Sequence, residues 1–129
     1  MGASLICLDS WAVLRWLEGA DPAATRVEGT FQERPVMNWI NLGEVFYIVH
    51  RSAGRTAAYA TVNDVRSRVI LDLASPARVL EAAAIKAAHP LAFADAFAIA
   101  TAQAHDAVLL TGDPEILGCD GEWRAEDLR

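Results

Sequence analysis

Short apolar runs alternate with longer amphipathic segments along this chain. Each run has four or five residues, and the clearest lie at 5–8, 36–40, 69–73 and 107–111. Runs of this length, apolar at nearly every position, are typical of strands that are buried on both faces of a parallel sheet. We therefore predict a strand at each run, and a final short strand around Trp123.

The segments between these runs have the spacing and the end signals of helices. After the second run, Leu42, Val45 and Val49 fall on one helical face, with Asn41 as the predicted N-cap and Gly54 as the end. By the same signals we predict helices at 10–17, 22–33, 41–53, 55–68, 76–89 and 93–105. Strands alternating with helices predict an α/β fold, a three-layer sandwich whose central parallel sheet carries helices on both faces.

Length and composition narrow the class of protein. The 129 residues suit one domain, 1–129, and 53% hydrophobic residues suffice for a core. The net charge of −6 argues against a general electrostatic binder of nucleic acids. Two cysteines cannot form a disulfide framework, and neither a signal peptide nor a membrane-length apolar run is apparent. These features predict a cytoplasmic protein with no membrane segment.

Four carboxylates occupy the predicted strand ends and the starts of the helices that follow. Asp9 ends the first strand, Glu44 lies one turn into the helix after the second, Asp95 opens the Ala-rich helix, and Asp113 follows the strand at 107–111. The carboxyl ends of parallel strands share one edge of a sheet, where ligands usually bind. We therefore expect the four acids to converge.

Each acid taken singly also fits a structural role. Asp9 could cap the first helix, and Asp113-Pro114 is a typical N-cap followed by proline. Asn41 and Glu44 fit a capping box, and a first-turn acid such as Asp95 suits the helix dipole. Asp95 is nevertheless the only charge in the apolar segment 91–104, and no basic residue lies within helical reach. A buried carboxylate needs a partner, so a hard cation such as Mg²⁺ or Mn²⁺ is the alternative.

Three segments carry a resemblance to a known family. They are LICLDSWAVLRWL (5–17), NLGEVFYIV (41–49) and LAFADAFAIATAQAHDAVLLTGDPE (91–115), in this order. The chain resembles the PIN-domain family, and more closely the VapC toxins of bacterial toxin–antitoxin pairs.

The resemblance implies a metal-dependent endoribonuclease that leaves 5′-phosphate and 3′-hydroxyl ends. The family's acidic positions correspond to Asp9, Glu44, Asp95 and Asp113, which would bind Mg²⁺ or Mn²⁺ and activate water. Ser10 and Thr111 match hydroxyl positions beside the acids and would hold carboxylates by hydrogen bonds. The resemblance also implies an RNA substrate, a cognate antitoxin that blocks the acidic site, and a homodimer.

Two other classes of phosphate-handling α/β protein do not fit the sequence. A response-regulator receiver needs an acidic pair after the first strand and a lysine after the last, and a haloacid-dehalogenase-type phosphatase needs Asp-x-Asp; the sequence has neither pattern. The alternative from another class is a catalytically silent PIN-like module that works through protein partners. The three histidines, His50, His89 and His105, lie near predicted helix ends and are interpreted as structural.

Overall fold

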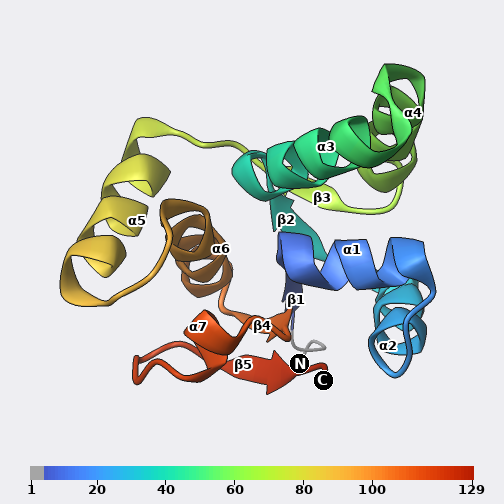
Figure 1. Cartoon of the computed structure of the whole chain (residues 1–129). Coiled ribbons are helices and arrows are strands. Elements are labelled where there is room, and N and C mark those ends of the chain that lie inside the picture. The colour runs from blue at the N-terminus through green and yellow to red at the C-terminus, as the bar shows by residue number, and fades with distance from the viewer. Residues whose placement is uncertain (1–4) are drawn as a thin grey trace.

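The structure, a computed structural model, describes residues 5–129. Within this range, parallel strands form one sheet in the order β3-β2-β1-β4-β5 (Figure 1). The strands are β1 (Leu5–Leu8), β2 (Val36–Asn38), β3 (Ile70–Asp72), β4 (Ala107–Thr111) and β5 (Ala125–Asp127). The predicted α/β fold with a central parallel sheet is confirmed.

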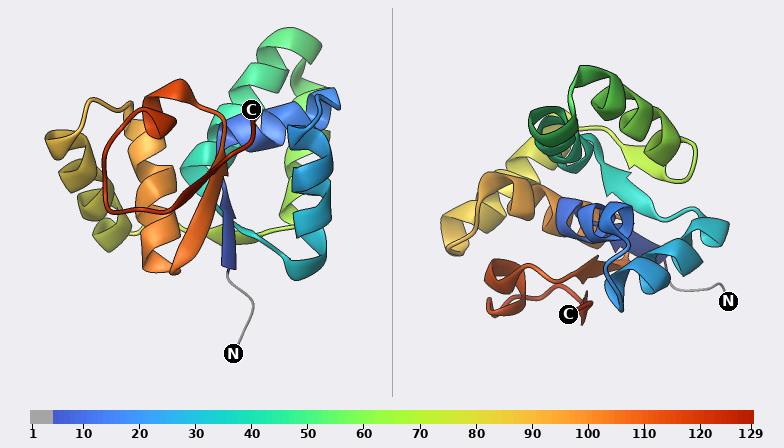
Figure 2. Two further views of the ribbon diagram at one scale, coloured as in Figure 1. Left: turned by 90° about the horizontal axis from the view of Figure 1, so that it is seen from below. Right: turned by 45° about the vertical axis from the view of Figure 1, so that its right-hand side comes forward.

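Helices follow the strands and cover both faces of the sheet (Figure 2). The helical elements are α1 (Ser10–Glu18), α2 (Ala23–Thr30), the 3-10 turn η1 (Phe31–Glu33), α3 (Trp39–Ala53), α4 (Arg55–Arg66), α5 (Pro76–Ala88), α6 (Phe93–Ala104) and α7 (Pro114–Leu117).

Alternation along the two central strands divides the core into two layers. Leu8 of β1 and Leu110 of β4 pack with residues of α1, α2, α3 and α4, whereas Cys7 and Leu109 pack with residues of α6 and α7. Cys7 pairs in register with Leu109, and Leu8 with Leu110. Side chains of successive strand residues point to opposite faces, so both faces of β1 and β4 are buried. This double burial explains the unbroken apolar runs in the sequence.

The start of α3 differs from the prediction. The second strand ends at Asn38 rather than at residue 40, and α3 begins at Trp39. Asn38 has extended backbone angles, and its side chain accepts a hydrogen bond of 2.8 Å from the Ile40 amide, so Asn38 is the N-cap. Asn41 is therefore a buried helical residue, and the predicted capping box of Asn41 and Glu44 is wrong.

Other boundaries shift by a few residues. The helix predicted at 22–33 begins at Ala23, and Pro22 is its N-cap. Its last predicted residues adopt the tighter turn η1. Trp123 lies before β5 rather than on it, packed against the α6 side of the core.

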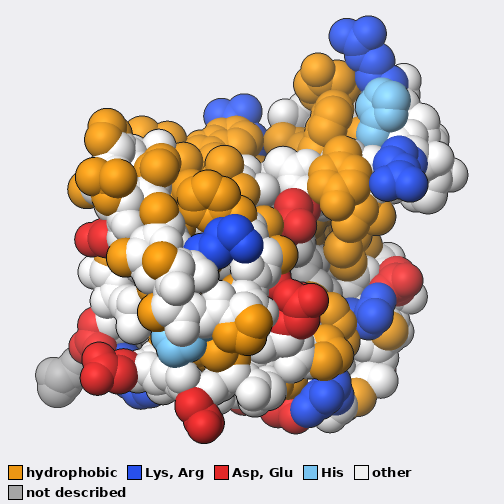
Figure 3. Space-filling model, turned by 60° about the vertical axis from the view of Figure 1, so that its left-hand side comes forward, with side chains coloured by type: hydrophobic (Ala, Val, Ile, Leu, Met, Phe, Trp, Pro, Cys, Tyr) orange, Lys and Arg blue, Asp and Glu red, His pale blue; other side chains and the backbone are white. Residues whose placement is uncertain are grey.

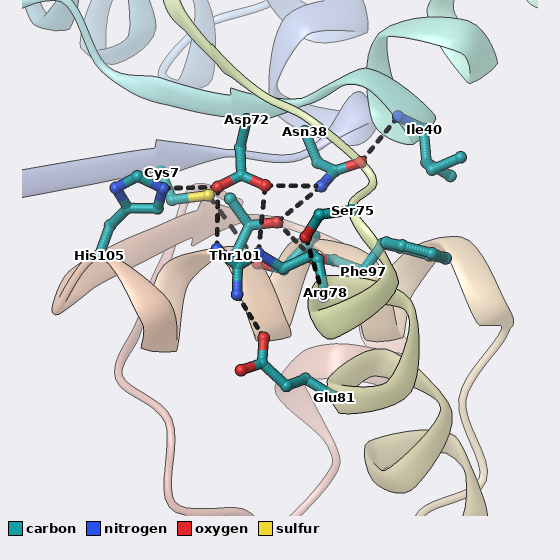
Figure 4. Close-up of polar contacts among 11 residues, drawn as sticks. Cys7, Asn38, Ile40, Asp72, Ser75, Arg78, Glu81, Phe97, Thr101 and His105 are labelled. Atoms are coloured by element: carbon teal, nitrogen blue, oxygen red, sulfur yellow. Dashed lines mark hydrogen bonds and ion pairs between the residues drawn. The ribbon is translucent and has the colours of Figure 1, made fainter.

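A buried polar network ties the edge strand β3 to α5 and α6 (Figure 4). Asp72 is 9% exposed and accepts two hydrogen bonds of 3.1 Å from the Arg78 guanidinium. The His105 ring nitrogen Nε2 lies 2.6 Å from Asp72 Oδ2, and the Asn38 amide donates to Asp72 and Thr101. Burial raises the pKa of Asp72, but the hydrogen bonds from Arg78 and His105 outweigh it and bring the pKa below its usual range.

Apolar side chains also reach the surface. They gather over much of the face in Figure 3, with acidic side chains between the groups. Large exposed examples include Tyr47, Tyr59, Leu73, Leu80 and Phe93. Within residues 5–129, no single helix is long and apolar enough to cross a bilayer. Only α5 and α6 taken together, with a bend of 118° between them, have the length and the apolar composition of a membrane span.

Candidate metal centre

The acidic residues lie around the carboxyl ends of the two central strands. Asp9 directly follows β1 and Asp113 follows β4 after one residue. Asp95 is in the first turn of α6, and Glu44 lies in the second turn of α3. The charges of Asp113, Glu44, Asp9 and Glu115 are close enough to Asp95 to raise its pKa. The strand order β2-β1-β4 thus brings together four side chains that span more than a hundred residues of sequence.

Asp9 is the most buried of the group, with 2% of its surface exposed. One carboxylate oxygen accepts a hydrogen bond of 2.8 Å from the Ala12 amide, which makes Asp9 the N-cap of α1. The other oxygen accepts a hydrogen bond from the Thr111 hydroxyl. The predicted cap is therefore present, and the same carboxylate belongs to the acidic group.

Two hydroxyls link neighbouring parts of the group. The Ser10 hydroxyl donates to Glu44 Oε1 at 2.7 Å, and so connects α1 to α3. Thr111 donates to Asp9, and its oxygen accepts a hydrogen bond of 3.0 Å from the Asp113 amide. These are the carboxylate-holding positions that the resemblance implied for Ser10 and Thr111.

A fifth acid, Glu115, joins the group and is not among the residues that the sequence singles out. One oxygen from each of Asp95, Asp113 and Glu115 lies within 4.8 Å of the others. Asp113 is the N-cap of α7 and accepts a hydrogen bond of 2.9 Å from the Glu115 amide. The available signal is two acids, two residues apart, at one helix start. An N-cap followed by proline explains the same segment, so the pattern by itself does not distinguish Glu115.

The electrostatics of the site favour protons or a cation. Burial, followed by the charges of Asp113 and Glu44, raises the pKa of Asp95 to about 7. Burial also raises the pKa of Asp9 to about 7, although hydrogen bonds from Thr111 and Ala12 lower it in part. Burial, which disfavours the charged form, is the main cause of both shifts, and the neighbouring carboxylates add to it.

Cationic side chains of the described residues do not neutralise this charge. Among residues 5–129, the ion pairs of Arg, Lys and His involve other carboxylates, such as Asp64, Asp72 and Glu126. Oxygen ligands alone, several of them anionic, suit a hard divalent cation such as Mg²⁺ or Mn²⁺. Oxygens of Asp95, Asp113 and Glu115 lie within 4.8 Å of one another and so fit such an ion, whereas Asp9 and Glu44 lie outside this group.

Other side chains that invite a functional interpretation have structural contacts. Trp11 packs against Gly112, where an added Cβ would lie 2.2 Å from the indole ring. His105 contacts Asp72, His89 Nδ1 lies 3.3 Å from the Cys119 sulfur, and His50 packs beside Phe46. The interpretation of the histidines as structural agrees with these contacts.

Comparison with known proteins agrees with the fold. The family model of the PIN domain matches residues 6–120. The chain belongs to the PIN-domain family. No curated protein sequence matches this PIN domain.

Solved structures of VapC-type proteins share the fold of this PIN domain. VapBC from Salmonella typhimurium, bound to DNA, matches with a TM-score of 0.78 and 17% identity over 98% of this chain and 100% of that chain. VapBC2 from Rickettsia felis, bound to a promoter fragment, matches with a TM-score of 0.77 and 15% identity over 97% of this chain and 99% of that chain. VapC20 from Mycobacterium tuberculosis, a sarcin-ricin loop cleaving toxin, matches with a TM-score of 0.71 and 16% identity over 88% of this chain and 93% of that chain. At these identities the likeness is one of fold.

Proposed function

We propose that this PIN domain is a Mg²⁺- or Mn²⁺-dependent endoribonuclease and acts in the cytoplasm as the toxin of a toxin–antitoxin pair. The acidic cluster carries the proposal: oxygens of Asp95, Asp113 and Glu115 lie within 4.8 Å of one another, and Asp9 and Glu44 are close enough to raise the pKa of Asp95. None of these acids forms an ion pair with a basic side chain of residues 5–129. Membership of the PIN family and the fold shared with VapC20 support RNA as the substrate.

The residues divide into holders of the cation and groups that orient those holders. Asp9 and Asp95 are the proposed direct ligands, and Glu44, Asp113 and Glu115 complete the oxygen set or act from a second layer. A bound divalent cation supplies a lowered water pKa and offsets the charge that builds on the phosphate during hydrolysis. Thr111 and Ser10 fix the orientations of Asp9 and Glu44, so these carboxylates need little rearrangement.

An apolar groove on the surface is an argument for a protein partner. A depression of about 220 Å³ between α3 and α4 is lined by Trp39, Leu42, Gly43, Phe46, Tyr59 and Val62. Exposed apolar surface of this kind marks interaction sites in soluble proteins. We propose that a cognate antitoxin covers this groove and places a basic side chain toward the acids, because the site is strongly negative. A second copy of the chain, forming a homodimer, would cover other apolar surface.

The test begins with metal binding rather than cleavage, because a narrow RNA specificity would hide activity. Calorimetric titration with Mn²⁺ should show binding by the antitoxin-free wild type and its loss in Asp95→Asn. Asp120→Asn makes the same chemical change at an exposed acid outside the site and should bind as the wild type does.

Cleavage then separates an enzyme from a silent module. With a mixed RNA pool and Mn²⁺, the wild type and Asp120→Asn should generate new 5′-phosphate ends, and Asp95→Asn should not. Equal cleavage by Asp95→Asn would remove the nuclease assignment. Metal binding without cleavage of any RNA would favour the silent module that acts through protein partners.

A further inference from the structure

One buried polar atom beside the acidic site has no partner among the described residues. Asn41 is 1% exposed, and its Nδ2 donates a hydrogen bond of 3.0 Å to the Ala94 carbonyl. Its Oδ1 is buried, and no group of residues 5–129 donates to it. Buried side-chain oxygens in proteins nearly always accept a hydrogen bond, so this exception requires an explanation.

The direction of the amide is set by chemistry. The Ala94 carbonyl can only accept, so the amide nitrogen must face it. The oxygen of Asn41 therefore faces away from Ala94, and exchanging the two atoms would place two acceptors against each other. The unpartnered atom is consequently the oxygen of Asn41.

Asn41 joins the helices that carry two of the acids. It precedes Glu44 by three residues on α3, and residues at this spacing are neighbours on a helix surface. Its partner Ala94 directly precedes Asp95 in the first turn of α6. The amide thus links the backbone beside Asp95 to the helical turn that carries Glu44. Leu42 and Val45, the other buried residues of α3, are apolar and have no side-chain donor.

We propose that Asn41 is a positioning residue of the metal site, whose Oδ1 accepts a hydrogen bond from the hydration water of the cation. This inference rests on the proposed metal-dependent function. The donation to Ala94 sets the distance between α3 and α6, and the free oxygen contributes a neutral acceptor to a site that is otherwise anionic. A neutral acceptor fixes the position of the hydration water without adding to the repulsion between the carboxylates.

The test compares Mn²⁺ affinity in variants of this one side chain. Asn41→Leu keeps the approximate volume and removes both the oxygen and the donor to Ala94, and we expect Mn²⁺ to bind it about 10-fold to 100-fold more weakly than the wild type, as for other second-layer changes. Asn41→Asp retains an oxygen but removes the donor to Ala94. It should bind Mn²⁺ at least as tightly as the wild type while unfolding at a lower temperature.

A buried asparagine at the start of the same helix provides the control for a purely structural effect. Asn38 is 0% exposed, but its amide is fully bonded to Asp72, Thr101 and the Ile40 amide. Asn38→Ser retains a capping oxygen and loses the donations, so it should lower the melting temperature and leave Mn²⁺ affinity unchanged. If Mn²⁺ affinity fell in proportion to stability in both Asn38→Ser and Asn41→Leu, the role of Asn41 would be structural only.

The outcomes also separate this inference from the proposed function. A folded wild type that binds no Mn²⁺ overturns both. Wild-type binding that Asn41→Leu matches overturns the role of Asn41 alone. If Asn41→Leu does not fold, Asn41→Asp decides: loss of Mn²⁺ binding in that folded variant contradicts the inference, and retained binding supports it.

Discussion

The Thr111 hydroxyl donates a hydrogen bond to the carboxylate of Asp9 and so joins the ends of the two central strands. The two residues are 102 positions apart in sequence, and both are almost fully buried. Thr111 lowers the pKa of Asp9 against the opposing effect of burial. The hydroxyl therefore stabilises the ionised form of Asp9, which is the form that binds a cation.

Thr111→Val should test this relationship. Valine has nearly the same shape but cannot donate, so the buried Asp9 loses one of its two hydrogen bonds. We expect weaker Mn²⁺ binding at neutral pH, because the pKa of Asp9 rises further, and a loss of about 1–3 kcal/mol in the free energy of unfolding measured at neutral pH. Thr111→Ser keeps the hydroxyl and should retain most of the affinity. Wild-type Mn²⁺ binding by Thr111→Val would contradict the role of the hydroxyl.

The metal-free protein should become less stable as the pH rises. Asp9 and Asp95 have pKa values of about 7, raised from 3.8 by burial and neighbouring charge. Between these values the folded protein binds more protons than the unfolded chain, so the free energy of unfolding falls with rising pH. Each unit by which folding raises a pKa corresponds to about 1.4 kcal/mol. A rise of only one unit at each of the two carboxyls would therefore lower the free energy of unfolding by about 3 kcal/mol over this pH range.

Urea denaturation at about pH 5 and about pH 8, with a chelator present, measures this slope. Asp95→Asn should flatten it, because the amide does not titrate, and should stabilise the metal-free protein at the higher pH. Saturating Mn²⁺ should also reverse the trend, since a cation competes with the protons. Wild-type stability that increases from acid to alkaline pH would show that burial does not disfavour the ionised form of the two carboxyls.

Asp72→Asn should weaken the fold without touching the metal site. The amide leaves Arg78 and His105 facing a neutral group in a buried setting, so we expect a loss of about 3 kcal/mol. Asp64→Asn breaks an exposed pair with Arg68 and should cost about 0.5 kcal/mol or less. Chemical denaturation measures both effects. Calorimetry should show unchanged Mn²⁺ affinity in each variant, and a change in Asp72→Asn would connect the two polar regions.

Most of the fold was predictable because its signals are local. The runs at 5–8 and 107–111 are apolar on both faces, and their predicted bounds coincide with β1 and β4. The acids after them were recognisable because they follow buried strands directly. The start of α3 was misplaced because Asn38 and Asn41 are both competent caps, and only the Asn38 contact with the Ile40 amide decides between them.

Relationships between distant segments were beyond local patterns. Asp72 lies inside the largely apolar run 69–73, and its partner His105 is 33 positions away. The unpartnered oxygen of Asn41 depends on the packing of α3 against Ala94. Such contacts follow from strand order and helix packing, which no spacing in the sequence specifies. The convergence of the acids likewise depends on the order β2-β1-β4, which local patterns do not specify.

Gly112 should tolerate no side chain, because the indole of Trp11 occupies the space where a Cβ would lie. The three nearest ring atoms are 2.2–2.5 Å from that position, so Gly112→Ala must displace the ring or the backbone between Thr111 and Asp113. Overpacking of this kind costs about 1–3 kcal/mol. Trp11 directly follows Ser10 in α1 and the backbone leads into Asp113, so either displacement disturbs the site and Mn²⁺ affinity should also fall.

Gly29→Ala is the matched comparison for this substitution. Gly29 is an exposed residue of α2, and no atom lies within 4 Å of the position that a Cβ would take there. Alanine restricts the unfolded chain and favours the helix, so this variant should be more stable by about 0.5–1 kcal/mol and should bind Mn²⁺ as the wild type does. If Gly112→Ala were as stable as Gly29→Ala, Trp11 would have room to move, and its packing against Gly112 would not be what fixes the turn that presents Asp113.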